Sequence, residues 1–207
     1  SRVFAARTCM MAGVGLTGVF LWYLVRFWVY GKAVVLTSAP LTIPAGFLIA
    51  GMAVATLIGA ALASWAAGPI SERIEEKNIP VARVVAGACL LYAAGLGLAW
   101  GLGVWSTGTA RENGMLLFAL ISGFAFGVYD SLGLELVMDS LPDPRRAGHD
   151  LGIYALANSA GLALAAIIGA LLVNAFEHSF GYYLLFPSAI VMVLMAGIVT
   201  LTTKSAE

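Results

Sequence analysis

Long apolar stretches alternate with short polar segments along the whole chain. A helix needs about 20 mostly apolar residues to cross the hydrocarbon core of a bilayer. The pattern therefore predicts six membrane-spanning helices in one domain that covers residues 1–207, and the short connections lead us to expect that consecutive helices are neighbours. The predicted spans are Thr8–Tyr30, Pro44–Ala67, Val81–Val104, Gly114–Met138, Leu151–Ala175 and Tyr182–Thr203.

The composition agrees with an all-α, polytopic membrane protein in contact with the lipid bilayer. Apolar residues make up 61% of the chain and charged residues 11%, which lies far outside the range of soluble domains. A formal net charge of zero argues against a nucleic-acid partner. The cysteines and histidines stand apart in the sequence, and no nucleophile–base pattern occurs. We therefore expect no metal site, no cofactor and no catalysis.

Small residues recur at intervals of four on several predicted helices. Such a stripe lets two helix backbones approach closely, which provides dispersion contacts where lipid offers no hydrophobic driving force. The stripes predict a tightly packed bundle. They comprise Gly51, Ala55, Gly59, Ala63 and Ala67; Gly95, Ala99 and Gly103; Gly123, Gly127 and Ser131; and Ala157, Gly161, Ala165 and Gly169. Pro69 is expected to close the second predicted helix after Gly68, and Pro187 falls inside the sixth.

Lys and Arg near the helix ends predict the orientation. Cytoplasmic loops carry an excess of these residues, so we expect both termini in the cytoplasm. The predicted cytoplasmic side holds Arg2, Arg7, Arg73, Lys77, Arg83, Arg145, Arg146 and Lys204, whereas the opposite side holds Lys32, Arg111 and, near the end of the first helix, Arg26.

Asp130 is the deepest carboxylate in the fourth predicted helix. Acids within a membrane segment are expensive and usually face a bundle interior or a water-filled path. Asp130, with Tyr129 and Ser131 beside it, either serves a substrate or proton pathway or is a structural acid bonded to a neighbouring helix. Asn158 in the fifth helix either bonds a neighbour or lines a cavity. Arg26, among aromatic residues, is an interfacial anchor or a ligand for an anionic substrate.

The connection after the second helix carries a charge pattern. Gly68 is followed by Glu72 and Arg73, and then by Lys77. The order of a glycine, an acid–Arg pair and a basic residue resembles the cytoplasmic signature of the major facilitator superfamily, although Glu75 and Glu76 depart from it. The resemblance implies that these charges lock neighbouring helices in one conformational state. The alternative is a solvated turn that anchors helix ends at the headgroups.

The join between the fourth and fifth helices carries a second set of charges. The set comprises Glu135, Asp139, Arg145 and Arg146, and the last three lie in the sequence DSLPDPRRAGHDLGIYALANSAG. This segment resembles the corresponding join in the C-terminal six-helix half of bacterial members of that superfamily. We expect Asp139, Arg145 and Arg146 to be gating charges, and Glu135 to be a gating or helix-end charge.

The resemblance implies two inverted three-helix repeats and half of a twelve-helix secondary transporter in the bacterial inner membrane. Such a half would move a small solute by alternating access against a second six-helix half. Transport could be coupled to the movement of protons. Because the chain begins at Ser1, we expect it to be trimmed or a fragment. The alternative function is that of an accessory subunit of a membrane complex, since a transporter fold can serve other roles.

Overall fold

The computed structural model describes residues 2–29, 43–105, 109–139, 147–176 and 178–202. These residues form helices and no strand, and six of the helical segments are long and apolar enough to cross a membrane. The protein is thus a multi-pass membrane protein of the all-α class, as predicted. Its elements are α1 (Arg2–Gly18), α2 (Leu21–Tyr23), the π-helix η1 (Leu24–Val29), α3 (Ile43–Glu76), α4 (Val81–Trp105), α5 (Thr109–Asp139), α6 (Ala147–Ala175) and α7 (His178–Leu201).

The first span differs from the prediction at its start and in its interior. It begins at Arg2 instead of Thr8, and it breaks into a turn at Val19 and Phe20 before α2 and η1 continue it. The apolar pattern continues through the break, which explains why the sequence did not reveal it. The earlier start places Arg7 more than one turn inside the helix.

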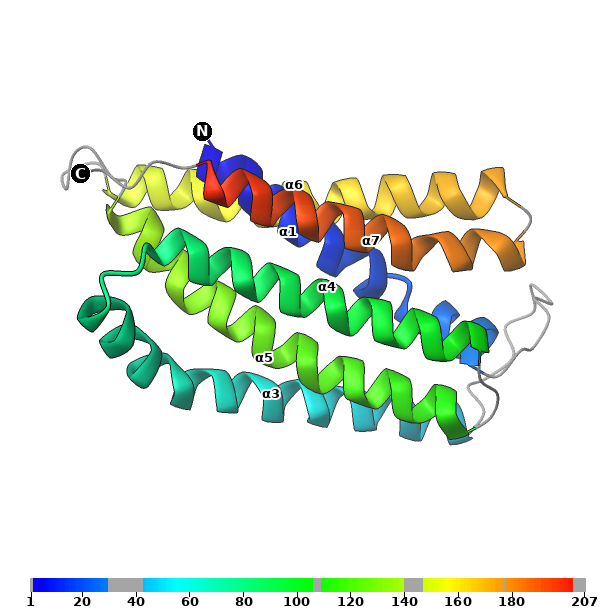
Figure 1. Ribbon diagram of the computed structural model, residues 1–207. Helices are drawn as coiled ribbons and strands as arrows, with labels where there is room; N and C mark the ends of the chain where they lie inside the picture. Colours follow the sequence, from blue (N-terminus) through cyan, green and yellow to red (C-terminus); the bar gives the residue numbers. More distant parts are fainter. Residues whose placement is uncertain (1, 30–42, 106–108, 140–146, 177, 203–207) are drawn as a thin grey trace.

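The second span does not end at Gly68 and Pro69, so the prediction that they close this helix was wrong. α3 continues through Pro69 to Glu76, and its last turns bend away from the main axis (Figure 1). A proline inside a helix removes one backbone hydrogen bond and kinks it without necessarily ending it. The helix ends instead at Glu76, and Asn78 just beyond it has a left-handed φ of 51°, a conformation typical of the residues that follow a helix C-terminus.

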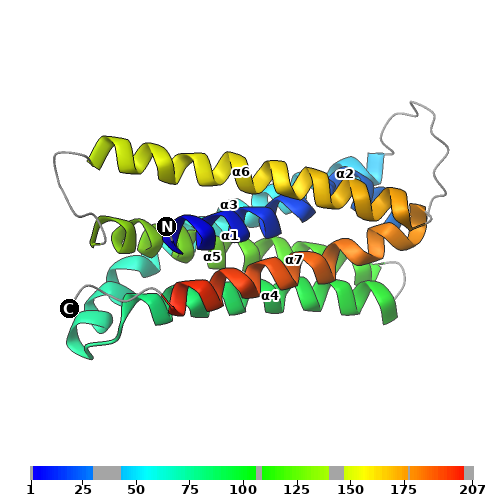
Figure 2. The same ribbon diagram turned by 90° about the horizontal axis from the view of Figure 1, so that it is seen from above.

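The helices form two layers (Figure 1). In one layer α1 packs along α6 and α7, and in the other α5 packs along α3 and α4, while α4 and α7 join the layers. Seen from above, α1 lies between α6 and α7 (Figure 2). Among the described residues, consecutive helices pack extensively as α4 with α5, more lightly as α6 with α7, and over a small contact as η1 with α3. The expectation that consecutive helices are neighbours is confirmed for these pairs and was wrong for α3 with α4 and for α5 with α6.

Both described ends of the chain lie at the same end of the bundle (Figure 1). There the Arg2 guanidinium donates a hydrogen bond to the Thr202 carbonyl oxygen over 2.6 Å. An even number of spans requires this arrangement.

Small residues allow the closest helix approaches, as the stripes predicted. Where α3 crosses α5, a Cβ atom added to Gly123 would collide with the Thr56 carbonyl, and one added to Gly127 would lie 2.6 Å from the Ala63 Cβ. Where α6 crosses α1, a Cβ atom on Gly161 would lie 2.7 Å from the Thr8 carbonyl oxygen. No larger residue fits at these points without moving a backbone.

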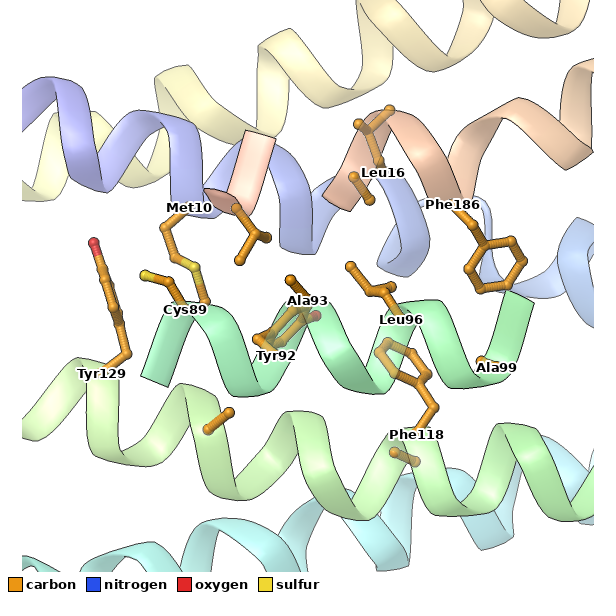
Figure 3. Packing of buried hydrophobic residues seen from close by; sticks show 14 of the residues in the cluster. Met10, Leu16, Cys89, Tyr92, Ala93, Leu96, Ala99, Phe118, Tyr129 and Phe186 are labelled. Carbon is orange, nitrogen blue, oxygen red and sulfur yellow. The ribbon is translucent and has the colours of Figure 1, made fainter. Parts of the chain in front are cut away.

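The apolar core lies between the layers. Figure 3 shows side chains of α1, α4, α5 and α7 meeting there, among them the fully buried Leu16, Leu96 and Phe186. The rings of Tyr92 and Phe118 meet edge to face, with centroids 6.0 Å apart. Large apolar side chains such as Phe47, Leu57 and Trp65 are exposed on the outside of α3. Apolar side chains on all sides of a helix are typical of a membrane span.

We predict that Gly123→Ala destabilises the protein by about 1 to 3 kcal/mol, because the added methyl group meets backbone at the α3–α5 crossing. Gly87→Ala on α4 is the matched control, since nothing lies within 4 Å of its added Cβ. It should be neutral or stabilising by up to about 1 kcal/mol, as expected for alanine in a helix. Unfolding in detergent micelles measures the stability of both variants. Equal effects of the two substitutions would contradict the close approach of α3 and α5 at Gly123.

Candidate functional site

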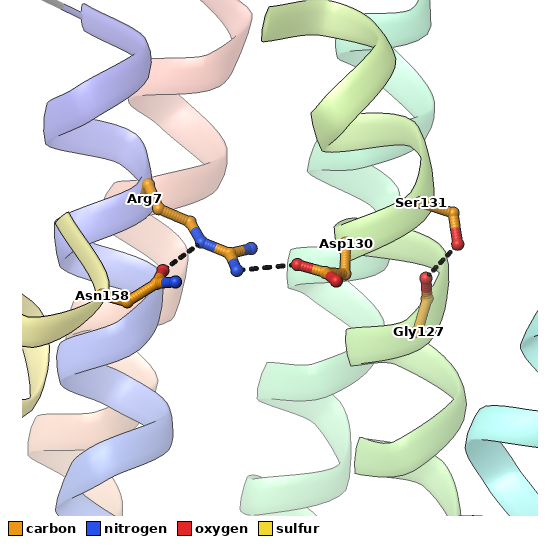
Figure 4. Close-up of polar contacts among 5 residues, drawn as sticks. All are labelled: Arg7, Gly127, Asp130, Ser131 and Asn158. Atoms are coloured by element: carbon orange, nitrogen blue, oxygen red, sulfur yellow. Dashed lines mark hydrogen bonds and ion pairs between the residues drawn. The ribbon is translucent and has the colours of Figure 1, made fainter. Parts of the chain in front are cut away.

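A buried arginine organises the polar contacts of the bundle. Arg7 on α1 is only 5% exposed. Its Nη2 atom lies 2.7 Å from Oδ1 of Asp130 on α5, and its Nε donates a hydrogen bond to Oδ1 of Asn158 on α6 over 2.7 Å. Figure 4 shows the guanidinium between these two side chains. Arg7 thus connects α1 and α6 in one layer with α5 in the other.

Three aromatic rings enclose the same guanidinium. Its Cζ atom lies 5.6 Å from the ring centroids of Phe126 and Tyr129 and 5.0 Å from that of Tyr154. At these distances the ring faces attract a cation, and desolvation strengthens the attraction. Among the described residues, the buried Nη1 atom of Arg7 has no hydrogen-bond partner. The rings compensate that nitrogen only partly, because a ring face is a weaker acceptor than an oxygen.

Asp130 is in a different environment from its partner. Its side chain is 54% exposed, compared with 6% for that of Arg7. One carboxylate oxygen bonds Arg7, while the exposed part of the group borders a cavity. The ion pair is therefore buried on the arginine side and accessible on the carboxylate side.

The cavity has a volume of about 390 Å³ and lies against α1, α3, α4 and α5. Several of its lining residues are exposed, so it opens to the outside of the bundle. Its lining comprises Val14, Thr56, Ala60, Ser64, Tyr92, Ser122, Gly123, Phe126, Gly127, Asp130 and Ser131.

The serine and threonine hydroxyl groups of this lining share one geometry. Each donates its proton to a carbonyl oxygen of its own helix: Thr56 to Met52, Ser64 to Ala60, Ser122 to Ala119 and Ser131 to Gly127, over 2.8 to 3.1 Å. Such bonds satisfy hydroxyl donors within a helix. The oxygen atoms keep lone pairs that can accept further hydrogen bonds.

The structure brings several predicted pathway residues together. Asp130 and Asn158 share Arg7 as their partner, the ring of Tyr129 is buried next to it, and Ser131 lines the cavity. Arg26 lies apart from them on η1, half-buried.

The described gating residues Gly68, Glu72, Arg73 and Lys77 are not part of the cavity lining. Gly68, Glu72 and Arg73 are exposed along the last turns of α3, and Lys77 is exposed in the turn that follows. Glu135 and Asp139 belong to the last turns of α5, where the structure describes the backbone only. Arg145 and Arg146 lie outside the described residues.

Comparisons of the chain with protein-family models, curated proteins and solved structures find no match. An accessible carboxylate that shares its charge with a buried guanidinium can accept hydrogen bonds or a proton from the cavity. In the part of the chain that the structure describes, no three His, Cys, Asp or Glu side chains come together as metal ligands would.

Arg7 is the site residue that the sequence interpretation missed. It was assigned to the charged residues outside the membrane, and this assignment was wrong because α1 begins at Arg2 and carries Arg7 inside the bundle. A signal was available, since an acid within a membrane segment usually has a partner. Arg7 is a basic residue at the same end of the bundle as Asp130.

We predict unequal effects when either member of the ion pair is removed. Asp130→Leu leaves a buried guanidinium without its counter-charge, and should destabilise the protein by roughly 3 to 5 kcal/mol. Arg7→Met should cost less, because the Asp130 carboxylate that remains is accessible from the cavity.

The double variant Arg7→Met/Asp130→Leu tests the same pair. Its unfolding in detergent should resemble that of Arg7→Met more than the sum of the two single effects, since contacting residues are not additive. Asp130→Asn is the conservative control, because its amide oxygen can still accept a hydrogen bond from Arg7. If the two single variants lost equal stability, and these losses added up in the double variant, the predicted difference between Arg7 and Asp130 would be contradicted.

Proposed function

We propose that this chain is half of a secondary active transporter of a small solute. The observation that carries the proposal is the open cavity with Asp130 on its wall. Lipid cannot satisfy a carboxylate or hydroxyl oxygen, so water or another polypeptide has to cover this opening. A second six-helix half placed over it would enclose a polar path near the membrane centre, where transporters of this type bind their substrates.

The packing of the helices supports the two inverted three-helix repeats. The contacts of α1 with α6 and α7 correspond to those of α5 with α3 and α4. Exchanging α1 with α5, α3 with α6 and α4 with α7 therefore preserves the main contacts of the bundle. Three spans per repeat also require the two repeats to be inverted relative to each other.

The resemblance of the charged connections to those of the major facilitator superfamily also supports this proposal. We infer that Glu72, Arg73 and Lys77 at the end of α3, together with Glu135, Asp139, Arg145 and Arg146, act as charges that lock or release helix ends during alternating access. Gly68 lies beside Pro69, near the bend of α3, and nothing lies within 4 Å of a Cβ atom added to it. The proposed location is the bacterial inner membrane.

An accessory membrane subunit is the second candidate function. The observation in its favour is that Arg7 pairs with both Asp130 and Asn158, as expected of a structural polar cluster. The exposed apolar side of α3, which includes Phe47, Leu57 and Trp65, would then contact a partner subunit instead of lipid.

The two candidates differ in the expected effect of Asp130→Asn. In a proton-coupled transporter this substitution should abolish proton-driven accumulation of the solute and leave facilitated exchange intact, because the amide cannot carry the proton. Uptake and counterflow in vesicles, with the complete product of the gene, measure the two activities. Full uphill transport by the variant would reject the coupling role. Loss of membrane insertion or folding would favour the structural role.

The proposed orientation, with both termini cytoplasmic, can be tested by cysteine labelling. Cysteines introduced at Ser38 and Thr107 should react with a membrane-impermeant maleimide added to intact cells, because both connections are expected outside the cytoplasm. A cysteine at Glu76, at the end of α3, should react only after the cells are opened. Labelling of position 76 in intact cells and protection of positions 38 and 107 would invert the topology.

A further inference from the structure

We propose that the cavity beside Asp130 binds a neutral, polyhydroxylated solute, such as a sugar or a sugar alcohol. This assignment rests on the proposed transport function and names the class of solute that the site would take. It follows from the hydrogen-bonding capacity of the cavity wall, from its charge and from its aromatic surfaces.

Apart from the hydroxyl of Tyr92, the polar side chains of the cavity wall offer hydrogen-bond acceptors. The hydroxyl protons of Thr56, Ser64, Ser122 and Ser131 are directed to carbonyl oxygens of their own helices, so the oxygen atoms present lone pairs. Asp130 adds a carboxylate, which in its ionised form only accepts. A solute that matches this wall has to supply several donors, and a group without donors would leave the wall oxygens unsatisfied.

Hydroxyl-rich solutes and organic cations both supply donors, and the charge distribution separates them. The Asp130 carboxylate is already compensated by Arg7 at 2.7 Å, so the pair is neutral as a unit. Arg7 is buried and is not part of the cavity wall. A cation bound at Asp130 would place a second positive charge near this guanidinium, whereas a neutral hydroxyl can share the exposed carboxylate oxygen without disturbing the pair.

The aromatic and steric features agree with a cyclic solute. Tyr92 and Phe126 contribute ring surfaces to a cavity of about 390 Å³, which lies within the range of about 300 to 1,000 Å³ of small-molecule sites. A sugar ring has apolar C–H groups on its faces and hydroxyls on its edge. The cavity likewise combines ring surfaces with a set of oxygen acceptors.

Protection of a cysteine in the cavity tests the assignment. Ala60→Cys places a thiol on the wall without removing a polar group, and Glu76→Cys, exposed at the end of α3, is the control outside the cavity. The complete gene product is purified in detergent and alkylated with N-ethylmaleimide, and the labelling of Cys9 and Cys89 in the parent protein is subtracted. The probes are glucose, mannitol and sucrose as neutral polyols, choline as a cation and lactate as an anion.

At least one polyol should slow alkylation at position 60 fivefold or more in a saturable manner, with no effect at position 76, and choline and lactate should not protect. Ser64→Ala and Ser122→Ala, each combined with the reporter cysteine, should raise the half-protecting concentration by roughly two- to tenfold, as expected when one acceptor is lost. Val14→Cys provides a second reporter from α1 if Ala60→Cys does not fold.

Two outcomes would overturn the assignment: protection by choline or lactate but by no polyol, and reactive cavity cysteines that no polyol protects. Uptake of the same radiolabelled probes by cells separates this assignment from the transport function. Polyol protection without uptake of any protecting polyol would support the binding site and count against transport. Uptake of choline or lactate without polyol protection would support transport and overturn the polyol assignment.

Discussion

The contact between Arg7 and Asp130 links the two layers of this bundle. A guanidinium within a spanning helix is costly to insert into hydrocarbon, and here it is compensated by a carboxylate from α5, an amide from α6 and three aromatic rings. α1 and α6 belong to one layer of the bundle, and α5 belongs to the other. The ion pair therefore depends on the relative position of the layers, and that position in turn is favoured by the ion pair.

The sequence predicted the coarse fold because hydropathy determines which segments cross a membrane. All six spans are present, and the glycine stripes correspond to close crossings. The break at Val19 and Phe20 and the continuation of α3 through Pro69 could not be predicted, since the residues on both sides are apolar or form good helices. After Pro69, Ile70 and Ile74 pack against the core, and hydropathy along one chain does not contain such contacts.

The candidate site was predicted in part. Asp130, Ser131 and Asn158 were recognised because polar groups are expensive among apolar residues. Their common partner, Arg7, was not recognised. It lies close to the N-terminus, where a basic residue is expected to contact lipid headgroups. The pairing of α1 with α6, and the approach of Arg7 to α5, are properties of the three-dimensional arrangement. Likewise, the acceptor character of the cavity depends on where each hydroxyl donates its proton.

The interruption of the first span after Gly18 has a mechanical consequence. On one side of the interruption, α1 is held through Arg7 to α5 and α6. On the other side, Tyr23 of α2 stacks on Tyr182 of α7, with ring centroids 6.1 Å apart. A continuous helix would transmit a tilt at one end to the other as a rigid rod. The turn at Val19 and Phe20 separates the segment that carries the ion pair from the segment that carries the stacked tyrosine, so the two contacts do not lie on one continuous rod.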